Sequence, residues 1–348
     1  MLDAAAAPAR VLRLGHPDGL QIAVLDHGAT WVSATLPLPG SGSPRELLLG
    51  CADLGGYLRQ RAYLGATIGR FTNRLRHARV CIDGVMHPLL ANEGPHQLHG
   101  GPEGFDRRRW TVDVHTADRL VLSLVSPDGD QGYPGEVRAQ VCYALEDRDC
   151  LCIDFQASTT RPCPVGLTHH AYFNLDGDAG QATRSCHGHH LRVQASQWLP
   201  TDEAGIPSQP LQPVDGYGLD LRQSRVLRQA IQGDPGLLAL GGIDHALALD
   251  PALCDGHQPV LELLGSDRRV LMTLATTQPA LQIYTGMSLS GVPSRDGGCY
   301  SASAGIALEP EALPDSPNHP VALPHWPETV LRPGDTWRAT SRLRFAVA

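Results

Sequence analysis

Trp110-Thr111-Val112-Asp113-Val114 and Leu120-Val121-Leu122-Ser123-Leu124 are two runs in which side chains alternate in character, with the short link Thr116-Ala117-Asp118 between them. Alternation with a period of two predicts strands, and so short a link predicts a hairpin. A second hairpin is predicted over Arg79 to Leu89, with its turn at Asp83-Gly84. This part of the chain therefore favours antiparallel pairing of neighbouring strands.

Similar patterns continue along the chain. The further strand candidates are 20 to 26, 29 to 36, 136 to 145, 150 to 158, 190 to 195, 259 to 264, 269 to 276, 280 to 285, 304 to 309 and 336 to 346. More than a dozen strands at roughly 8 to 12 residue spacing are typical of sandwiches and barrels. Only 53 to 62 and 220 to 232 are predicted as helices. No internal repeat or long linker is apparent, so we expect an all-β fold, a large antiparallel β-sandwich, with residues 1–348 in a single domain.

The composition argues against several classes of function. The formal net charge is -8 and there is no long Lys/Arg cluster, which disfavours nucleic acid or an anionic membrane as a partner. No apolar run approaches the roughly 18 residues of a membrane span, and the N-terminus lacks the regions of a secretory signal, so we expect a cytoplasmic protein. Most of the nine cysteines are expected to be free thiols, with Cys142, Cys150 and Cys152 as small buried hydrophobes.

Glu309 is the first candidate for chemistry. It ends a short apolar run, Ala304 to Leu308, and is followed by Pro310. The proline favours an extended conformation and removes the next backbone donor, which suits a strand end that opens onto a cleft. A carboxylate there would be partly desolvated and more basic than in water. From position alone, a solvated glutamate at a strand end is an equally good interpretation.

His170 is the second candidate, in a strand-like run from Val165 to Leu175 that mixes aromatic, amide and imidazole side chains. Histidine is the side chain best suited to donate a proton near neutral pH. Because adjacent residues on a strand face opposite sides, at most one of His169 and His170 can point into a given pocket. A lone histidine in such a run is more often a hydrogen-bonded core residue.

Two segments that contain glycine could supply binding groups. His99 precedes Gly100-Gly101, where the backbone can approach a ligand closely, and His96 competes for the same role. Upstream, Asn73 and Arg74 place an amide beside a guanidinium, which together offer several directed donors to hydroxyl groups. Taken alone this pair is weak evidence, since most such pairs are surface residues.

The segment Cys186-His187-Gly188-His189-His190 crowds soft and imidazole ligands together. It could be a metal site, but no distant partner ligands are apparent, so an exposed polar turn is the favoured interpretation. We predict neither a metal nor an organic cofactor.

Seven segments resemble, in order and form, the aldose 1-epimerase (galactose mutarotase) family. They are Gly69 to Leu75, Gln97 to Trp110, Ser126 to Gly135, Leu167 to Leu175, Gly242 to His245, Leu281 to Gly286 and Gly305 to Asn318. The resemblance implies a β-sandwich of the galactose-mutarotase type with a sugar site in an open cleft. It further implies His170 as the general acid, Glu309 as the general base, and sugar contacts at Asn73, Arg74, His99, Asp244 and Gln282.

The chain departs from the family pattern at three positions. His169 stands where an asparagine is common, Met287 where an asparagine is frequent, and Glu311 where a glutamine is usual. The extra carboxylate of Glu311 is expected to raise the pKa of Glu309 by like-charge repulsion. The sequence leaves open which aldose is preferred and whether the protein is a monomer or a homodimer.

The implied activity is the interconversion of the α and β anomers of a free aldohexose such as galactose or glucose. A proton leaves the C1 hydroxyl and another reaches the ring oxygen, so a base and an acid on opposite sides of the sugar would suffice without a cofactor. With reference pKa values of about 4.3 for Glu and 6.5 for His, the rate should peak between these values. An optimum near neutrality would then require a raised pKa for His170.

Two other functions stay open at this point. One is a non-catalytic sugar-binding or sensor domain on the same fold, which the presence of both His170 and Glu309 disfavours. The other is a hexose-phosphate epimerase, which would need a basic cluster for the phosphate. The one run of three basic residues is Arg107-Arg108-Arg109, and a strand would split it between two faces.

Overall fold

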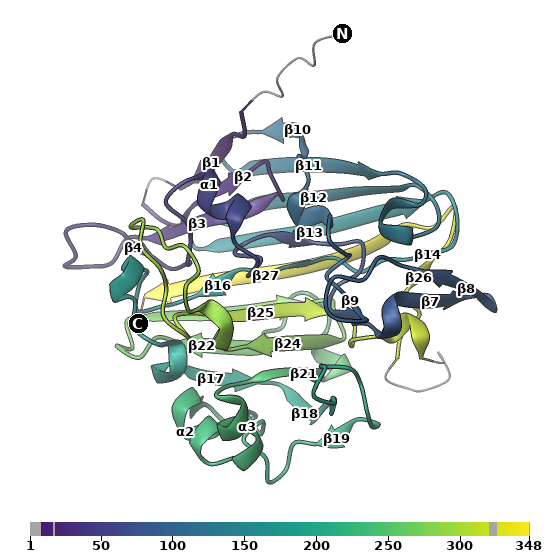
Figure 1. Cartoon of the computed structure of the whole chain (residues 1–348). Helices are drawn as coiled ribbons and strands as arrows, with labels where there is room; N and C mark the ends of the chain where they lie inside the picture. The colour runs from purple at the N-terminus through teal and green to yellow at the C-terminus, as the bar shows by residue number, and fades with distance from the viewer. Residues whose placement is uncertain (1–7, 17, 320–325, 348) are drawn as a thin grey trace.

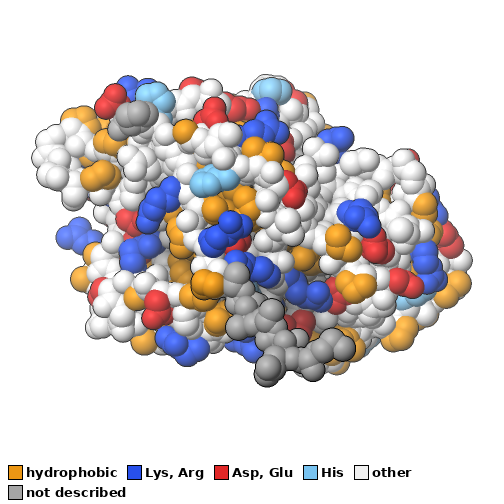
Figure 2. Space-filling model, turned by 90° about the horizontal axis from the view of Figure 1, so that it is seen from above, with side chains coloured by type: hydrophobic (Ala, Val, Ile, Leu, Met, Phe, Trp, Pro, Cys, Tyr) orange, Lys and Arg blue, Asp and Glu red, His pale blue; other side chains and the backbone are white. Residues whose placement is uncertain are grey.

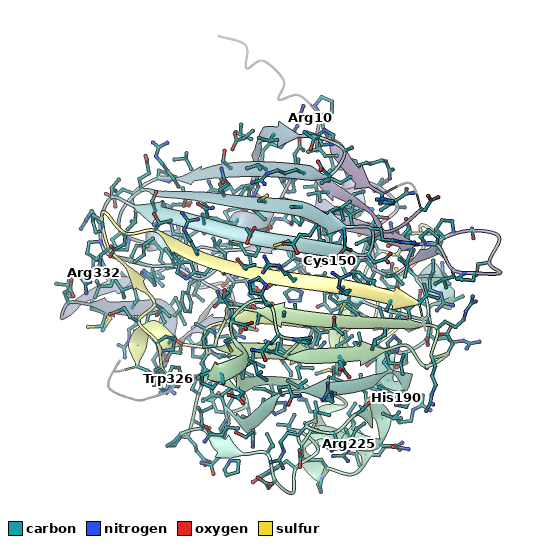
Figure 3. All side chains as sticks on the ribbon, turned by 180° about the vertical axis from the view of Figure 1, so that it is seen from behind. Arg10, Cys150, His190, Arg225, Trp326 and Arg332 are labelled. Atoms are coloured by element: carbon teal, nitrogen blue, oxygen red, sulfur yellow. The ribbon has the colours of Figure 1, made fainter. Side chains whose placement is uncertain are left out.

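Antiparallel strands dominate the secondary structure of a computed structural model that describes residues 8–16, 18–319 and 326–347 (Figure 1). The largest sheet has nine strands in the order β10-β11-β12-β13-β27-β23-β22-β17-β20. Their bounds are β10 Thr111–His115, β11 Arg119–Ser126, β12 Val137–Asp147, β13 Cys150–Thr159, β27 Trp337–Val347, β23 Val270–Thr276, β22 Leu261–Leu264, β17 His190–Val193 and β20 Arg225–Val226. Seen from behind, β27 crosses the middle of this sheet in yellow (Figure 3).

A second sheet of six strands has the order β16-β25-β24-β21-β18-β19. Its bounds are β16 Tyr172–Phe173, β25 Ile306–Glu311, β24 Ala280–Tyr284, β21 Asp244–Leu249, β18 Ala195–Trp198 and β19 Gln212–Pro213. A four-stranded sheet is formed by β1 Val11–Gly15, β2 Gln21–Leu25, β3 Thr30–Leu36 and β4 Arg45–Glu46. These two sheets pack on the large one.

Short strand pairs complete the β-structure. They are β15 Thr168–His169 with β5 Thr67–Ile68, β6 Arg74–Leu75 with β9 Gln97–Leu98, β7 Arg79–Ile82 with β8 Val85–Pro88, and β14 Cys163–Pro164 with β26 Val330–Leu331. The α-helices are α1 Leu54–Arg59, α2 Leu227–Gln232 and α3 Pro235–Leu240. The 3-10 helices are η1 Arg76–Ala78, η2 Phe105–Arg107, η3 Asp130–Gly132, η4 Gly180–Ala182, η5 Cys186–Gly188, η6 Pro251–Leu253, η7 Met287–Leu289 and η8 Ser316–Asn318. Within the described ranges, none of these helices is long and apolar enough to cross a membrane.

The core lies between the layers. Phe155 of β13, Leu274 of β23 and Leu343 of β27 point inward from the large sheet. They meet Trp31 of β3 and Leu308 of β25, which belong to the other two sheets. Alternation along β25 therefore buries Leu308 in the core and turns Glu309 to the opposite face, away from the large sheet.

The prediction of an all-β sandwich is confirmed, and the strands predicted by range occur with ends within two residues of the expected bounds. The strand-like run from Val165 to Leu175 instead contains only the short β15 and β16, which belong to separate sheets. Both predicted hairpins form, as β10 with β11 and β7 with β8. The strand β21 was not predicted. Its sequence, Asp244-His245-Ala246-Leu247-Ala248-Leu249, is rich in alanine and leucine, which favour helix in isolation, and pairing with β24 and β18 overrides that preference.

The helix predictions are only partly right. The helix expected over 53 to 62 is α1 and ends at Arg59. The helix expected over 220 to 232 is wrong in its first half, because Arg225-Val226 pairs with β17 and the helix begins only at Leu227. The helix α3 was missed although its signals are present: Asp234 caps it, Pro235 begins it, and Gly241 ends it in the left-handed conformation.

The cysteine prediction holds. All nine cysteines are free thiols, and Cys142, Cys150 and Cys152 are buried. Burial raises the pKa of Cys150 to about 11, which keeps this thiol protonated and unreactive. On the outer surface, acidic and basic side chains are interspersed with hydrophobic ones over the face seen in Figure 2.

Candidate active site

A cleft of about 530 Å³ opens on the face of β24 and β25 that points away from the large sheet. Seven residues singled out from the sequence line this one cavity: Asn73, Arg74, His99, His170, Asp244, Gln282 and Glu309. They come from six separate parts of the chain. The fold therefore brings together every predicted site residue.

The strands β21, β24 and β25 form the floor of the cleft. Gln282 lies opposite Glu309 in the register of β24 and β25, and Asp244 lies opposite Tyr284 in the next pair. Gln282 donates a hydrogen bond from Nε2 to Oδ1 of Asp244 at 2.6 Å. This bond leaves Oε1 of Gln282 and Oδ2 of Asp244 as acceptors for hydroxyl groups of a ligand.

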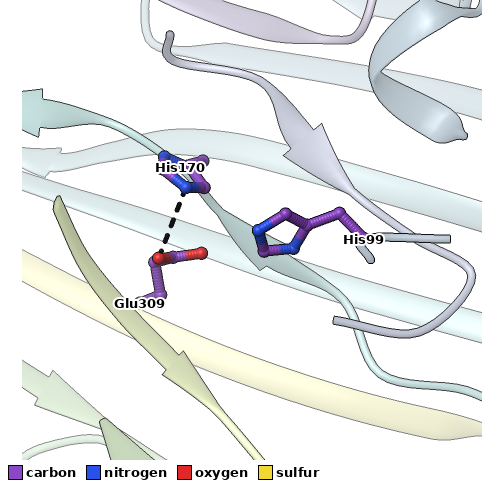
Figure 4. Close-up of side chains that lie close together, drawn as sticks. All are labelled: His99, His170 and Glu309. Atoms are coloured by element: carbon purple, nitrogen blue, oxygen red, sulfur yellow. Dashed lines mark ion pairs between the residues drawn. The ribbon is translucent and has the colours of Figure 1, made fainter. Parts of the chain in front are cut away.

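His170 and Glu309 are adjacent and buried. Nε2 of His170 lies 3.5 Å from Oε1 of Glu309, and the two side chains point toward one another in Figure 4. Within the described part of the chain, Nδ1 of His170 and Oε2 of Glu309 are buried without a hydrogen-bond partner. Such unpaired polar atoms are costly, and they are common where a substrate supplies the missing bond.

The placement of His170 and Glu309 differs from the expected arrangement, in which an acid and a base lie on opposite sides of the sugar. The two groups are neighbours on the cleft floor, 3.5 Å apart. The reason is chemical, because the C1 hydroxyl oxygen and the ring oxygen are both bonded to C1. Groups that exchange protons with these two oxygens can therefore lie close together.

The two adjacent histidines face opposite ways, as predicted. His170 points into the cleft, whereas the ring of His169 packs edge-on against Trp31 at 5.4 Å and Tyr143 at 6.0 Å in the core. Burial lowers the pKa of His169 to about 3, so this imidazole stays neutral. It serves packing, and it does not reach the cleft.

His99 rather than His96 lines the cleft. Its backbone is in the left-handed conformation with a φ of 52°. Nδ1 of His99 accepts a hydrogen bond from the backbone N–H of Asn73 at 3.2 Å. Burial lowers the pKa of His99 well below its usual value, so the neutral ring carries its proton on Nε2 and can donate to a ligand. His96 instead accepts from the backbone of His77 through Nδ1.

Burial moves the pKa values of His170 and Glu309, the central pair of the cleft, in opposite directions. Desolvation lowers the pKa of His170 to about 4. Desolvation, followed by the negative charges of Glu311 and Asp244, raises the pKa of Glu309 well above its usual value. The expectations of a more basic Glu309 and of repulsion by Glu311 are thus confirmed in direction. An optimum near neutrality was expected to require a raised pKa for His170, but its pKa is lowered, because burial removes the solvation of the charged imidazole.

The sequence interpretation missed the aromatic wall of the cleft. Tyr63, Tyr172 and Tyr284 line it, and the rings of Tyr63 and Tyr172 lie 5.7 Å and 5.0 Å from that of His170. Tyr172 could have been found, because it lies two residues after His170 in an extended segment. Tyr63 could not, since its place follows from the end of α1 at Arg59 and a left-handed turn at Tyr63 itself.

The histidine-rich segment at Cys186 is not the exposed polar turn that was expected. Cys186 and His189 are both buried, and Nε2 of His189 accepts a hydrogen bond from the backbone N–H of Leu175 at 2.8 Å. The segment forms η5 and packs inward. These side chains are structural because the loop must satisfy buried backbone groups.

One group of described side chains, which includes the central pair, could be considered as a metal site. Among the described residues, His99, His170 and Glu309 are the group of three whose ligand atoms lie within 4.8 Å of one another. Donor atoms around a tetrahedral zinc ion at about 2.1 Å lie closer together, at roughly 3.4 Å. The trio would have to contract to hold one, whereas proton exchange with a ligand needs no such change.

The fold and the cleft together define an all-β protein of the enzyme class, with a buried imidazole and carboxyl pair in a polar cleft. A family model described as Aldose 1-epimerase matches residues 10–344. The aldose 1-epimerase of Escherichia coli (strain K12) is 42% identical over 341 residues, covering 97% of this chain and 95% of that protein. The galactose mutarotase of Homo sapiens is 35% identical over 332 residues, covering 95% and 92%.

Solved structures agree with this relationship. An aldose epimerase homologue from C. elegans has a TM-score of 0.87 and 26% identity, covering 98% of this chain and 100% of that one. A galactose 1-epimerase from Lactobacillus acidophilus NCFM has a TM-score of 0.82 and 25% identity, covering 97% and 94%. The chain belongs to the aldose 1-epimerase family, and it is an isomerase of that class.

Proposed function

We propose that this protein interconverts the α and β anomers of a free aldohexose such as galactose or glucose, with His170 as general acid and Glu309 as general base. The observation that carries the proposal is the pair itself: a buried imidazole and a buried carboxyl, 3.5 Å apart, on the floor of a cleft lined by tyrosines and hydroxyl-binding groups. The names of the relatives, aldose 1-epimerase and galactose mutarotase, support the same substrate class.

The reaction needs two proton transfers in each direction. Glu309 takes the proton of the C1 hydroxyl, the electrons of that O–H bond form the C1 carbonyl, and the bond between C1 and the ring oxygen breaks. His170 supplies a proton to the ring oxygen. After rotation about the C1–C2 bond, the same transfers in reverse close the ring on the other face. Each positioned proton transfer is worth about 10² to 10⁴ in rate.

The pair needs only one exchangeable proton between its two members. The opening step starts with that proton on His170 and leaves it on Glu309, so the neutral pair that burial favours is the state from which the ring closes. For a cyclic sugar the neutral pair becomes competent when one proton moves from Glu309 to His170, whose Nε2 lies 3.5 Å from Oε1 of Glu309. The lowered pKa of His170 is therefore compatible with its role.

Five other side chains of the cleft are proposed to hold the sugar hydroxyls: Asn73, Arg74, His99, Asp244 and Gln282. The guanidinium of Arg74 is partly engaged, since its Nε and Nη2 donate to the carboxylate of Glu93 at 2.7 and 2.9 Å. Its Nη1 remains to donate to a hydroxyl. The ion pair fixes the direction of that donor, which supports a role in positioning the ring.

A phosphorylated sugar is disfavoured by the charges around the cleft. The lining holds Arg61 and Arg74 against Glu93, Asp244 and Glu309. Arg107 and Arg108 do not line the cleft. Arg107 donates to the carbonyl of Leu58, and Arg108 pairs with Asp130. A phosphate dianion would meet more carboxyl groups than guanidinium groups here.

Polarimetry with freshly dissolved α-glucose and α-galactose tests the roles of the pair. His170→Asn and Glu309→Gln should each lower kcat/KM by at least about 10²-fold, since each removes one proton transfer. Circular dichroism and thermal melting check that the variants fold. A variant that folds and retains the rate of the unmodified protein would refute the assignment. A protein that binds sugar without any turnover would favour the sensor function instead.

Three broader features are also proposed. We expect residues 1–348 to form one domain, because a single buried cluster contains residues from Leu12 to Phe345. We expect a cytoplasmic protein that is a monomer or a homodimer. Sedimentation velocity and cell fractionation test these two points.

A further inference from the structure

Glu311 lies two residues after Glu309 on β25, so both carboxyl groups project from the same face of the strand. Glu311 is fully buried and does not line the cleft. Opposite it in the register is Ala280, which belongs to an apolar cluster with Leu199, Ala246, Leu313 and Trp326. A carboxyl group is therefore held beside apolar side chains, just beneath the active site.

The contacts of Glu311 lead back to the cleft. Its Oε1 accepts a hydrogen bond from Nδ2 of Asn73 at 2.8 Å. Asn73 in turn donates its backbone N–H to Nδ1 of His99, and its Oδ1 accepts from the backbone N–H of Arg74. Three of the proposed sugar-binding residues are thus connected to this one buried carboxyl group.

The charged groups that face Glu311 come from three elements. They are Glu309 on the same strand, Asp244 on β21 and Arg74 on β6, and the hydroxyl of Thr72 is the nearest additional polar group. Among the described residues, Oε2 of Glu311 and the hydroxyl of Thr72 have no hydrogen-bond partner. Burial raises the pKa of Glu311 to about 8, so this group changes charge near the upper end of the physiological range.

We propose that Glu311 is a positioning residue of this site, which holds Asn73 through its carboxyl oxygen and uses its negative charge to make Glu309 retain its proton. The proposal rests on the proposed roles of His170 and Glu309. A glutamine, which is usual in the family at this position, would keep an acceptor for Asn73 but would carry no charge. Glu311 is therefore an ionisable group that acts on the base through space.

The expected consequence is that the enzyme stays active to a higher pH. The central pair is active while it holds one proton, and at alkaline pH that proton is on Glu309. Two like charges about 7 Å apart, as expected for residues two apart on one strand face, interact appreciably at an effective dielectric constant of about 20. Ionised Glu311 should therefore move the alkaline limb of the rate profile upward by roughly 1 to 2 pH units.

The test compares the pH profiles of kcat/KM for the unmodified protein and Glu311→Gln by polarimetry, with the spontaneous rate subtracted at each pH. The two proteins should agree within about twofold at pH 6 to 7, where Glu311 is protonated. The alkaline limb of E311Q should lie about 1 to 2 pH units lower, so that on this limb its rate is at least about tenfold lower. An unmoved limb, or a loss of activity that is equal at all pH values, would overturn the proposal.

Two further variants separate charge from contact. Glu311→Asp keeps the charge but is too short to reach Asn73, so the alkaline limb should stay in place while KM for the sugar rises. Glu262→Gln removes a carboxylate from β22 that pairs with Arg192 far from the cleft, and its profile should not change. If Glu309→Gln is inactive while the E311Q limb does not move, the proposed function stands and the role of Glu311 fails. If Glu309→Gln stays active, the proposed function itself fails.

Discussion

At the scale of single residues, burial sets the chemistry of this site. Reference pKa values would place the productive pair in a narrow acidic window between those of glutamic acid and histidine. The structure inverts the order of the two values, because desolvation lowers the pKa of His170 and raises that of Glu309. The single-proton state of the pair then extends from about pH 4 upward through neutrality.

The pH dependence of kcat/KM follows from these directions. As the pH falls through about 4, His170 and Glu309 both become protonated and no base remains. As the pH rises through the raised pKa of Glu309, the pair loses its last proton and no acid remains. We expect a broad plateau that includes pH 7, measured by polarimetry between pH 4 and 9.5. A narrow optimum below pH 6 would contradict the inverted order.

Glu309→Gln should be inactive and yet more stable than the unmodified protein at neutral pH. Folding raises the pKa of Glu309. The protonated carboxyl therefore contributes fully to the stability of the folded protein below its unfolded-state pKa, near 4.3, and this contribution is lost as the pH rises through its folded-state pKa. Between these two pKa values, the free energy of unfolding of the variant should rise by about 1.4 kcal/mol per pH unit relative to that of the unmodified protein.

Thermal melts at pH 5, 6 and 7 measure this difference, and Glu262→Gln, from a half-buried ion pair on β22, serves as the control that should show no such trend. If Glu309→Gln melts at a lower temperature than the unmodified protein at pH 7, or if the difference does not grow with pH, the pKa of Glu309 is not raised by folding.

At the scale of elements, strand pairing and tight turns place the site. The register of β24 and β25 sets Gln282 beside Glu309, and two left-handed turns at Asn73 and His99 bring their side chains over this floor. Gly100 makes the second turn feasible. It has a φ of 86°, and a Cβ atom on it would overlap the carbonyl group of Gly69.

Gly100→Ala tests the importance of this close approach. The added methyl group must displace the backbone at Gly69, so we expect a loss of more than about 2 kcal/mol in the free energy of unfolding and a clear rise in KM. Gly84→Ala is a matched control, because Gly84 also has a positive φ of 79° but faces open space at the hairpin turn. It should cost about 1 kcal/mol and leave activity unchanged.

Urea unfolding and polarimetry provide the two measurements. Equal losses of stability in the two alanine variants would show that only the backbone conformation matters. The contact between the segments at 69 and 100 would then not be needed to hold His99.

At the scale of the whole molecule, the end of the chain is central to the structure. The strand β27 lies between β13 and β23 in the large sheet, and Phe345 on it is buried in the core. The buried cluster runs from Leu12 to Phe345, so segments near both ends of the chain share one interior. The active site depends on this interior because β25 packs on it through Leu308.

Phe345→Ala should destabilise the protein as one unit. Loss of a buried phenylalanine costs about 3 to 5 kcal/mol, and in a single domain the entire calorimetric transition should move to lower temperature. Val347→Ala, on the same strand but exposed, should have little effect. Two transitions, of which only one moves, would contradict the proposal of a single domain.

The sequence alone was sufficient for much of the fold. Strand positions such as those of β12, β13 and β27 follow from local alternation, because one buried face imposes a period of two on the side chains. It failed where distant pairing overrides local preference: β21 is a strand despite its alanine and leucine, and the segment before Leu227 is a strand because it pairs with β17. The helix α3 was missed in spite of its own cap residues.

For the site, the sequence proposed His170, Glu309 and five further residues, since residue type and motif indicate which groups can transfer protons or bind hydroxyls, and all seven line one cleft. Only the tertiary structure decided that His170 and Glu309 are neighbours, that Nδ1 of His99 accepts a backbone hydrogen bond, and that burial lowers the pKa of His170 and raises that of Glu309. These properties depend on the distances between side chains of different strands and on their burial from solvent. Both are set only when strands far apart in the sequence pack together.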